Sequence, residues 1–175
     1  MANNKKFNVV SIVLLAVLAV ALIMGIVGLC IDWLSVTTEI ASVKETEAMK
    51  LAEMVKDNKD AGGDLYKAIG AVQAFAIISV IAAALTLISY LVSKFVDLKV
   101  LKFVTIACAA VLILCALLAL ILTFVTGNSE IFDYAKKAAE AMKGKFTVMP
   151  AAGCWLLSIF GIVGGAAGVY GGLKG

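Results

Sequence analysis

The chain alternates between long apolar stretches and shorter polar ones. Four stretches, over about residues 7–31, 70–92, 100–125 and 150–173, contain almost no polar side chains. A helix needs about 20 such residues to cross the hydrocarbon core of a bilayer. The sequence therefore predicts an all-α protein. It is expected to be a four-helix transmembrane bundle, a tetraspan, formed as one integral membrane domain over residues 1–175.

The first apolar stretch has an alternative interpretation as a cleaved signal peptide. Its apolar run is longer than the usual apolar core of a signal peptide, which has about 7–15 residues. Cys30 near its end follows Leu29, whereas a lipoprotein cleavage site needs a small residue there. We therefore expect this stretch to be a transmembrane span.

The polar segment over residues 32–69 is predicted to contain an amphipathic helix over Thr38–Asn58. Ser42 and Glu45 have the spacing of a capping box, although a start nearer Thr37 or Thr38 fits equally well. A break at residues 60–64 follows, with Asp64 as the N-cap of the helix that forms the second span. One side of the predicted helix carries its apolar residues: Ile40, Val43, Ala48, Leu51, Ala52 and Val55.

The polar segment over residues 126–149 is predicted to contain a second short helix. Gly127 ends the third span, Ser129 caps a helix from Glu130 to about Lys143, and Pro150 opens the fourth span as a first-turn proline. The apolar face of this helix holds Ile131, Ala135, Ala138, Ala139 and Met142. Two interpretations stay open: the two short helices pack on each other, or they offer a contact surface through Ile131, Ala135, Ala138 and Met142.

Lysine placement predicts the orientation. The N-terminus, the 93–102 link and the C-terminal tail together carry six lysines and one aspartate. Segment 32–69 has five lysines against eight acids, and segment 126–149 has four lysines against three acids. Because cytoplasmic loops carry the excess of lysine, both termini are expected in the cytoplasm of a multi-pass cell-membrane protein. The same rule predicts Trp33, Tyr66 and Trp155 at the outer interface, and Tyr90, Phe103 and Tyr170 at the inner one.

The composition excludes several kinds of catalytic and binding site. Hydrophobic residues make up 63% of the chain, the mean hydropathy is +1.06, and there is no His and no Arg. His-based catalysis, His metal sites and Arg-based nucleic-acid recognition are thereby excluded. The spans hold no Asp or Glu and only Lys102 near one end, which argues against an ion-coupled transporter. We expect no enzyme activity, no cofactor, no metal and no nucleic-acid partner, with membrane lipid as the surroundings.

The four cysteines differ in depth. Cys108 and Cys115 lie within the third span, where small apolar packing explains them. Cys30 and Cys154 lie at matching depth near the outer ends of the first and fourth spans. A disulfide between Cys30 and Cys154 is possible if these spans are neighbours, and two free thiols are the alternative.

The most specific pattern is a series of glycines in the fourth span. Its members recur at four-residue spacing: Gly161, Gly164, Gly165, Gly168 and Gly172. Small residues at this spacing let two membrane helices approach closely. The pattern favours packing against another copy of the chain, with packing inside the bundle as the alternative.

The layout, with both termini inside and a longer first outer segment, resembles that of the claudin and tetraspan families. The resemblance is one of topology. Between Asp32 and Ile69 there is neither the Gly-Leu-Trp motif nor the cysteine pair of claudins, and the second outer segment lacks the Cys-Cys-Gly of tetraspanins. Large-pore channels share the span count. No family's functional residues are carried over.

Three functions fit the sequence. The first is a structural membrane protein that self-associates into a homo-oligomer or array through the glycine-rich fourth span and the outer helices. The second is a pore-forming oligomer for ions or small solutes, lined by Ser79, Thr86 and Ser89. The third is an accessory subunit of a larger complex with other membrane subunits.

Overall fold

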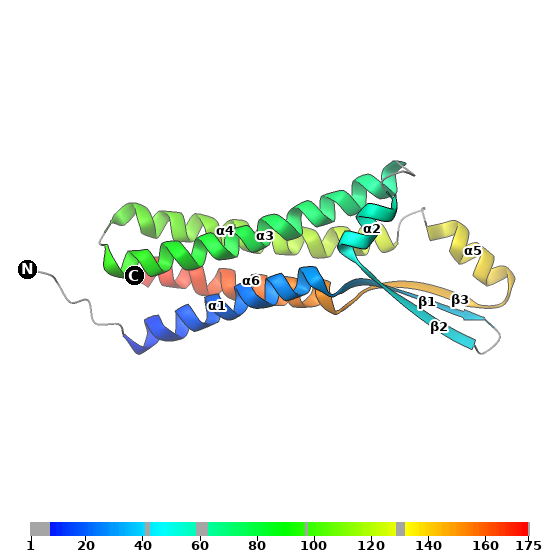
Figure 1. Ribbon diagram of the computed structural model, residues 1–175, viewed down its shortest axis with the longest axis horizontal. Helices are drawn as coiled ribbons and strands as arrows, with labels where there is room; N and C mark the ends of the chain where they lie inside the picture. The colour runs from blue at the N-terminus through cyan, green and yellow to red at the C-terminus, as the bar shows by residue number, and fades with distance from the viewer. Residues whose placement is uncertain (1–7, 41–42, 59–62, 97, 129–131, 175) are drawn as a thin grey trace, which may run out of the picture.

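The computed structural model describes residues 8–40, 43–58, 63–96, 98–128 and 132–174, which form six helices and one three-stranded sheet (Figure 1). In chain order the elements are α1 (Val9–Cys30), β1 (Asp32–Ile40), β2 (Val43–Lys50), α2 (Leu51–Asn58), α3 (Gly63–Phe95), α4 (Lys99–Gly127), α5 (Asp133–Ala141), β3 (Lys145–Pro150) and α6 (Ala152–Lys174).

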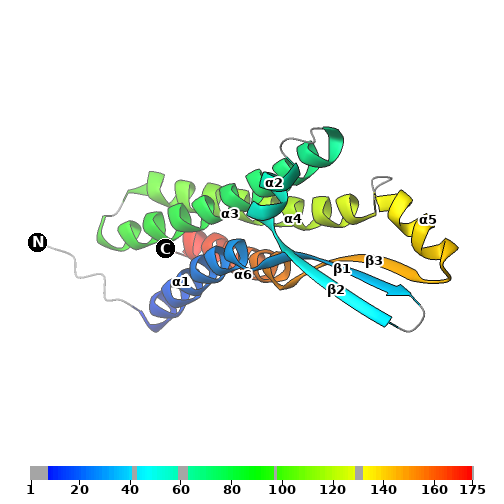
Figure 2. The same cartoon turned by 45° about the vertical axis from the view of Figure 1, so that its right-hand side comes forward.

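Helices α1, α3, α4 and α6 are long and apolar enough to cross a membrane, which confirms the four predicted spans. They run side by side in a bundle (Figures 1 and 2). Large apolar side chains such as Ile12, Leu114 and Val163 lie about half exposed on the outside of this bundle. A water-soluble protein would bury them, so the surface fits a bilayer and a multi-pass membrane protein.

Helix α6 is the central member of the bundle. It packs against α1, α3 and α4, and it is the most buried of the four spans. The other large contacts are those of α3 with α4 and of α1 with α3. Helix α6 therefore needs small residues on more than one side, because three neighbours approach it.

The ends of the bundle differ. Helix α1 begins and α6 ends at one end, where α3 also gives way to α4; we call this the terminal end (Figure 1). The sheet, α2 and α5 lie at the other, the sheet end. In both views the sheet and α5 project beyond the long helices (Figure 2).

The sheet corrects the prediction of an all-α fold. Its strand order is β2-β1-β3, and both strand pairs are antiparallel. The helix predicted over Thr38–Asn58 is wrong over most of its length, since only α2 is helical there; Ser42, its proposed cap, lies outside the described residues. Three β-branched residues in a row at Val36, Thr37 and Thr38 favour an extended chain, and pairing with β1 holds the charged β2 in the same state.

The second short helix is confirmed in part. Helix α5 covers Asp133–Ala141, inside the predicted range, while Ser129, Glu130 and Ile131 lie outside the described residues. Lys143 adopts a left-handed φ of 57° just after the helix, and the backbone of Gly144 then packs against the carbonyl oxygen of Glu39. A side chain at position 144 would collide with that oxygen. This turn therefore brings β3 alongside β1.

Two predicted helix starts are shifted. Pro150 is the last residue of β3 rather than the first turn of α6, which begins at Ala152. As an edge strand, β3 tolerates a proline at its end. Asp64 lies in the first turn of α3 instead of capping it, and it forms an exposed ion pair with Lys67 at 3.3 Å. Gly127 ends α4 as predicted.

Candidate functional site

The glycines of α6 all face the interior of the bundle. A Cβ atom at Gly164 would lie 2.5 Å from Cβ of Ala21 on α1, and one at Gly161 would lie 2.7 Å from Cβ of Ala116 on α4. At Gly168 it would meet Thr86 Cγ2 on α3 at 2.5 Å. The glycines are thus the points where three helices of the same chain touch α6.

Gly165 and Gly172 complete the same pattern. A Cβ atom at Gly165 would collide with the side chain of Ile113, and one at Gly172 would lie 2.5 Å from Cγ1 of Ile106. Both neighbours belong to α4. The prediction that this face meets another copy is therefore wrong for the folded chain. A helix with three neighbours needs glycines in more than one direction, so the pattern does not require a second molecule.

The residues proposed as a pore lining are part of the core. Ser79 and Thr86 are fully buried, and Ser89 is 7% exposed. Thr86 donates a hydrogen bond to the carbonyl oxygen of Ala82, and Ser89 donates one to that of Thr86. Ser89 Oγ also lies 3.0 Å from Thr105 Oγ1 on α4. The hydroxyls of Thr86, Ser89 and Thr105 thus have partners inside one bundle, and all three proposed lining residues are buried within it.

The cysteines are free thiols. Helices α1 and α6 are neighbours as the disulfide prediction required, since a Cβ at Gly153 would lie 2.5 Å from the Gly28 carbonyl oxygen. Cys154 is fully buried, however, whereas Cys30 is exposed. The structure thus has Cys30 and Cys154 as two free thiols, the alternative that the sequence left open beside a disulfide.

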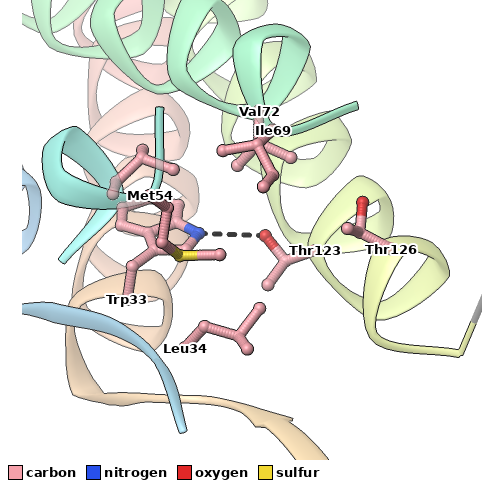
Figure 3. A pocket seen from close by; sticks show the side chains of 8 residues that line it. Trp33, Leu34, Met54, Ile69, Val72, Thr123 and Thr126 are labelled. Carbon is pink, nitrogen blue, oxygen red and sulfur yellow. Dashed lines mark hydrogen bonds between the residues drawn. The ribbon is translucent and has the colours of Figure 1, made fainter. Parts of the chain in front are cut away.

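The sheet is attached to the bundle through Trp33. Its side chain is fully buried, and its indole Nε1 donates a hydrogen bond of 3.0 Å to Thr123 Oγ1 on α4 (Figure 3). Thr123 in turn donates to the carbonyl oxygen of Ala119. The Trp33 carbonyl oxygen accepts a hydrogen bond of 2.8 Å from the amide of Ala151, the residue between β3 and α6. Trp33 is therefore an internal anchor and not the interfacial aromatic residue that the sequence predicted.

The other aromatic residues that were predicted at the membrane interfaces differ in their exposure. Trp155 is 42% exposed, and its ring meets Phe124 edge to face at 6.0 Å. Phe103 and Tyr170 are exposed at the terminal end. Tyr90 is only 1% exposed, because α6 passes over its ring at Gly171. Three of these aromatic residues thus have the exposure that an interfacial position needs.

The space beneath α2 is filled by packing. Figure 3 shows the side chains that surround it: Trp33, Leu34, Met54, Ile69, Val72, Thr123 and Thr126, with Leu51 completing the lining. The remaining volume is about 10 Å³, room for at most about one water molecule. This space does not fit a substrate. It belongs to the core that fixes α2 over α3 and α4.

The two faces of the sheet differ in their surroundings. Cross-strand pairing places Leu34, Val36, Phe146 and Val148 on one side, the packed face. There Val148 contacts Gly127 at the end of α4, and the Phe146 ring stacks on Phe132 at 6.2 Å. Residues on the other side, the open face, form three rows: Ser35–Ala48–Met149, Thr37–Thr46–Thr147 and Glu39–Lys44–Lys145.

The open face is exposed to solvent. Every one of its β2 and β3 residues is exposed, including Met149 at 59%. In its centre Thr37 and Thr46 share a hydrogen bond of 3.2 Å between their hydroxyl oxygens. Its first two rows carry no charge, and only the row at the tip does. Sequence reasoning missed this surface because it treated the segment as a helix; the β-branched run in β1 was the available signal.

The predicted outer contact surface on α5 is mostly covered. Ala135 and Ala138 are half-buried and Ala139 is buried, while α5 packs along β3. Met142 is 56% exposed, and Ile131 lies outside the described residues. The apolar side of α5 therefore serves mainly to hold the sheet. Of the predicted contact residues that the structure describes, Met142 alone offers a large exposed side chain.

Comparison of the chain with family models, with curated proteins and with solved structures finds no match. The likeness to claudin and tetraspan layouts stays a resemblance of topology. Within the described ranges no three residues of His, Cys, Asp and Glu lie close enough together to hold a metal ion. The feature that stands out is accordingly the open face of the sheet.

Proposed function

We propose that the protein is a structural four-span membrane protein whose open face holds neighbouring copies together in a homo-oligomer or array. The observation that carries this proposal is the uncharged centre of that face. Two full rows across three strands hold only Ser, Thr, Ala and Met. Surface strands that face water only usually carry charges, whereas charge is depleted at the core of an interface.

Confinement in the membrane makes a small interface sufficient. A three-stranded sheet offers less area than a standard soluble interface, which buries about 800 Å² per partner. Copies that share one bilayer already have a high effective concentration and a common orientation. Two open faces can pack as two sheets do, about 10 Å apart, with Met149 and Ala48 supplying the apolar contact.

Edge-to-edge pairing of two sheets is disfavoured by the charges of β2. The strand lies at one edge of the sheet and carries Lys44, Glu45, Glu47 and Lys50. In the two antiparallel registers that pair nearly the whole strand with its copy, either Glu45 faces Glu47 or Lys44 faces Lys50. Like charges directly opposite each other destabilise a strand pair. Contact through the open face avoids these repulsions.

The orientation that we propose follows the lysines. The terminal end would lie in the cytoplasm of a cell-membrane protein and the sheet on the outer side, surrounded by membrane lipid between them. A structural role without catalysis is supported by the absence of His and Arg and by spans without Asp or Glu.

The experiment measures the mass of the native particle after gentle release into detergent or nanodiscs, together with cross-linking in the intact membrane. We expect an oligomer that dissociates when Thr46→Lys and Thr147→Lys place charges at the centre of the open face. Val43→Lys adds the same charge as Thr46→Lys to an exposed site on β2 but on the packed-face side; it is the matched control for that substitution and should leave the oligomer intact.

Two results would reject the proposal. One is a protein that stays monomeric by both measurements. The other is co-purification of a different chain in a fixed ratio without contact between copies, which would favour an accessory subunit instead.

A further inference from the structure

A second surface lies at the terminal end, far from the sheet. There a cavity of about 250 Å³ opens between the start of α1 and the last turns of α3 and α6. Its lining combines basic, aromatic and small polar side chains: Asn8, Ser11, Tyr90, Lys94, Tyr170 and Lys174, with Val10, Leu14 and Gly171. A water molecule takes up about 30 Å³ in the liquid, so the cavity has room for a group of several heavy atoms.

Both lysines of the cavity are held over aromatic rings that line it. Lys94 Nζ lies 4.5 Å from the centre of the Tyr90 ring, and Lys174 Nζ lies 5.6 Å from that of Tyr170. Tyr90 is itself almost fully buried, under Gly171 of α6. These contacts keep two positive charges beside the cavity.

The start of α1 adds donors to the same place. Asn8 is the N-cap residue of α1, and its side chain forms no capping hydrogen bond. The N–H groups at the start of a helix carry a partial positive charge, and in this first turn the Ser11 N–H donates to the Asn8 carbonyl oxygen at 2.8 Å. Asn8, Val10 and Ser11 from this first turn line the cavity. Two ammonium groups, a helix start and small polar side chains together match a phosphate group.

A simpler explanation is that Lys94 and Lys174 offset the negative ends of α3 and α6, in whose last turns they lie. That role requires neither a cavity nor two lysines that line the same space. Here the two lysines come from different helices and line one hollow together with the N-terminus of a third. The hollow also lies at the ends of three helices that are long and apolar enough to cross a membrane, and the ends of such helices meet the lipid headgroups.

We infer that this cavity binds the phosphate headgroup of an anionic phospholipid, with Lys94 and Lys174 as its charged ligands. Basic pockets between transmembrane helices on the cytoplasmic side are a recognised way to bind such headgroups. The inference does not depend on whether the open faces associate. Lys99 and Lys102 lie at the same end but outside this cavity, at the start of α4, where they line a separate hollow of about 350 Å³ that is otherwise apolar; they provide the comparison.

The test counts lipids retained by the protein in native mass spectrometry and measures affinity in nanodiscs that contain phosphatidylglycerol or only phosphatidylcholine. We expect selective retention of phosphatidylglycerol. Lys94→Gln or Lys174→Gln should weaken binding about fivefold each, and the double variant about 25-fold. The double variant Lys99→Gln with Lys102→Gln removes the same charge from the same end and should change binding much less.

Ser11→Leu tests the contribution of the cavity apart from that of the lysine charges, because it narrows the hollow and leaves both lysines in place. It should weaken phosphatidylglycerol binding as well, while Lys94→Arg should retain it. Equal losses in the two lysine double variants would overturn the inference in favour of general surface attraction, as would equal binding of both lipids. If glycerol phosphate in detergent protects the protein from thermal unfolding as strongly as phosphatidylglycerol does, the site takes soluble phosphates and the lipid assignment falls.

Discussion

The glycine face of α6 and the open face of the sheet form an instructive pair. Small residues occupy the centre of both, yet Gly164 and Gly168 are buried against the chain's own helices while Thr46 and Thr147 are exposed. The glycine face is occupied because α6 has three neighbours. The open face is exposed, whereas α5 and the end of α4 cover the packed face along β3. A run of small residues thus indicates a close contact. Whether the partner is another element of the same chain or another molecule depends on how many elements of the chain already pack there.

The largest expected effect comes from the residue that joins the two regions. Trp33→Ala should lower the free energy of unfolding by about 3–5 kcal/mol, because it empties a fully buried site and removes the hydrogen bond to Thr123. SDS titration in mixed micelles, followed by circular dichroism, gives this value. Trp33→Phe keeps most of the volume and should cost much less. Equal stability of Trp33→Ala and the original chain would show that the sheet is not anchored here.

The next effect tests the glycine face directly. Gly168→Leu should destabilise the bundle by about 1–3 kcal/mol or more, since its side chain would run into Thr86 and Ala109. Ala166→Leu is the matched control, because Ala166 lies on the exposed side of the same helix. The same titration compares the two variants. A change in the mass of the native particle with Gly168→Leu, at unchanged stability, would instead restore the intermolecular role of the glycines.

The smallest effects compare one hydroxyl from each region. Thr123→Val leaves the buried indole N–H of Trp33 without its partner and should cost about 1–3 kcal/mol. Thr37→Val removes an exposed hydrogen bond to Thr46 and should change stability by less than about 0.5 kcal/mol. Both substitutions preserve side-chain shape, so the titration midpoints compare like with like. A larger shift of the titration midpoint for Thr37→Val than for Thr123→Val would contradict the contrast between the anchored region around Trp33 and the open face of the sheet.

The spans were predictable because a bilayer requires long apolar helices, and these leave an unmistakable pattern. The sheet was not predicted, because the apolar residues of segment 38–58 could be placed on one side of a helix, although Lys44 and Glu47 intruded on that side. The strand β2 pairs with β1, and β1 pairs in turn with β3, which comes from the segment between the third and fourth spans. The cavity at the terminal end combines three helix ends that lie far apart in the sequence, so only their packing brings Lys94 and Lys174 together.

The direct continuation of α1 into β1 and of β3 into α6 has a mechanical consequence. Ile31 and Ala151 alone separate each helix from its strand, so the sheet has no flexible hinge at these joints. A pull on its tip is transmitted as shear along α1 and α6, whose backbones touch at Gly28 and Gly153. A backbone contact has no side chain that can yield. We therefore expect a force on the sheet to act first on α1 and α6, at the contact between Gly28 and Gly153.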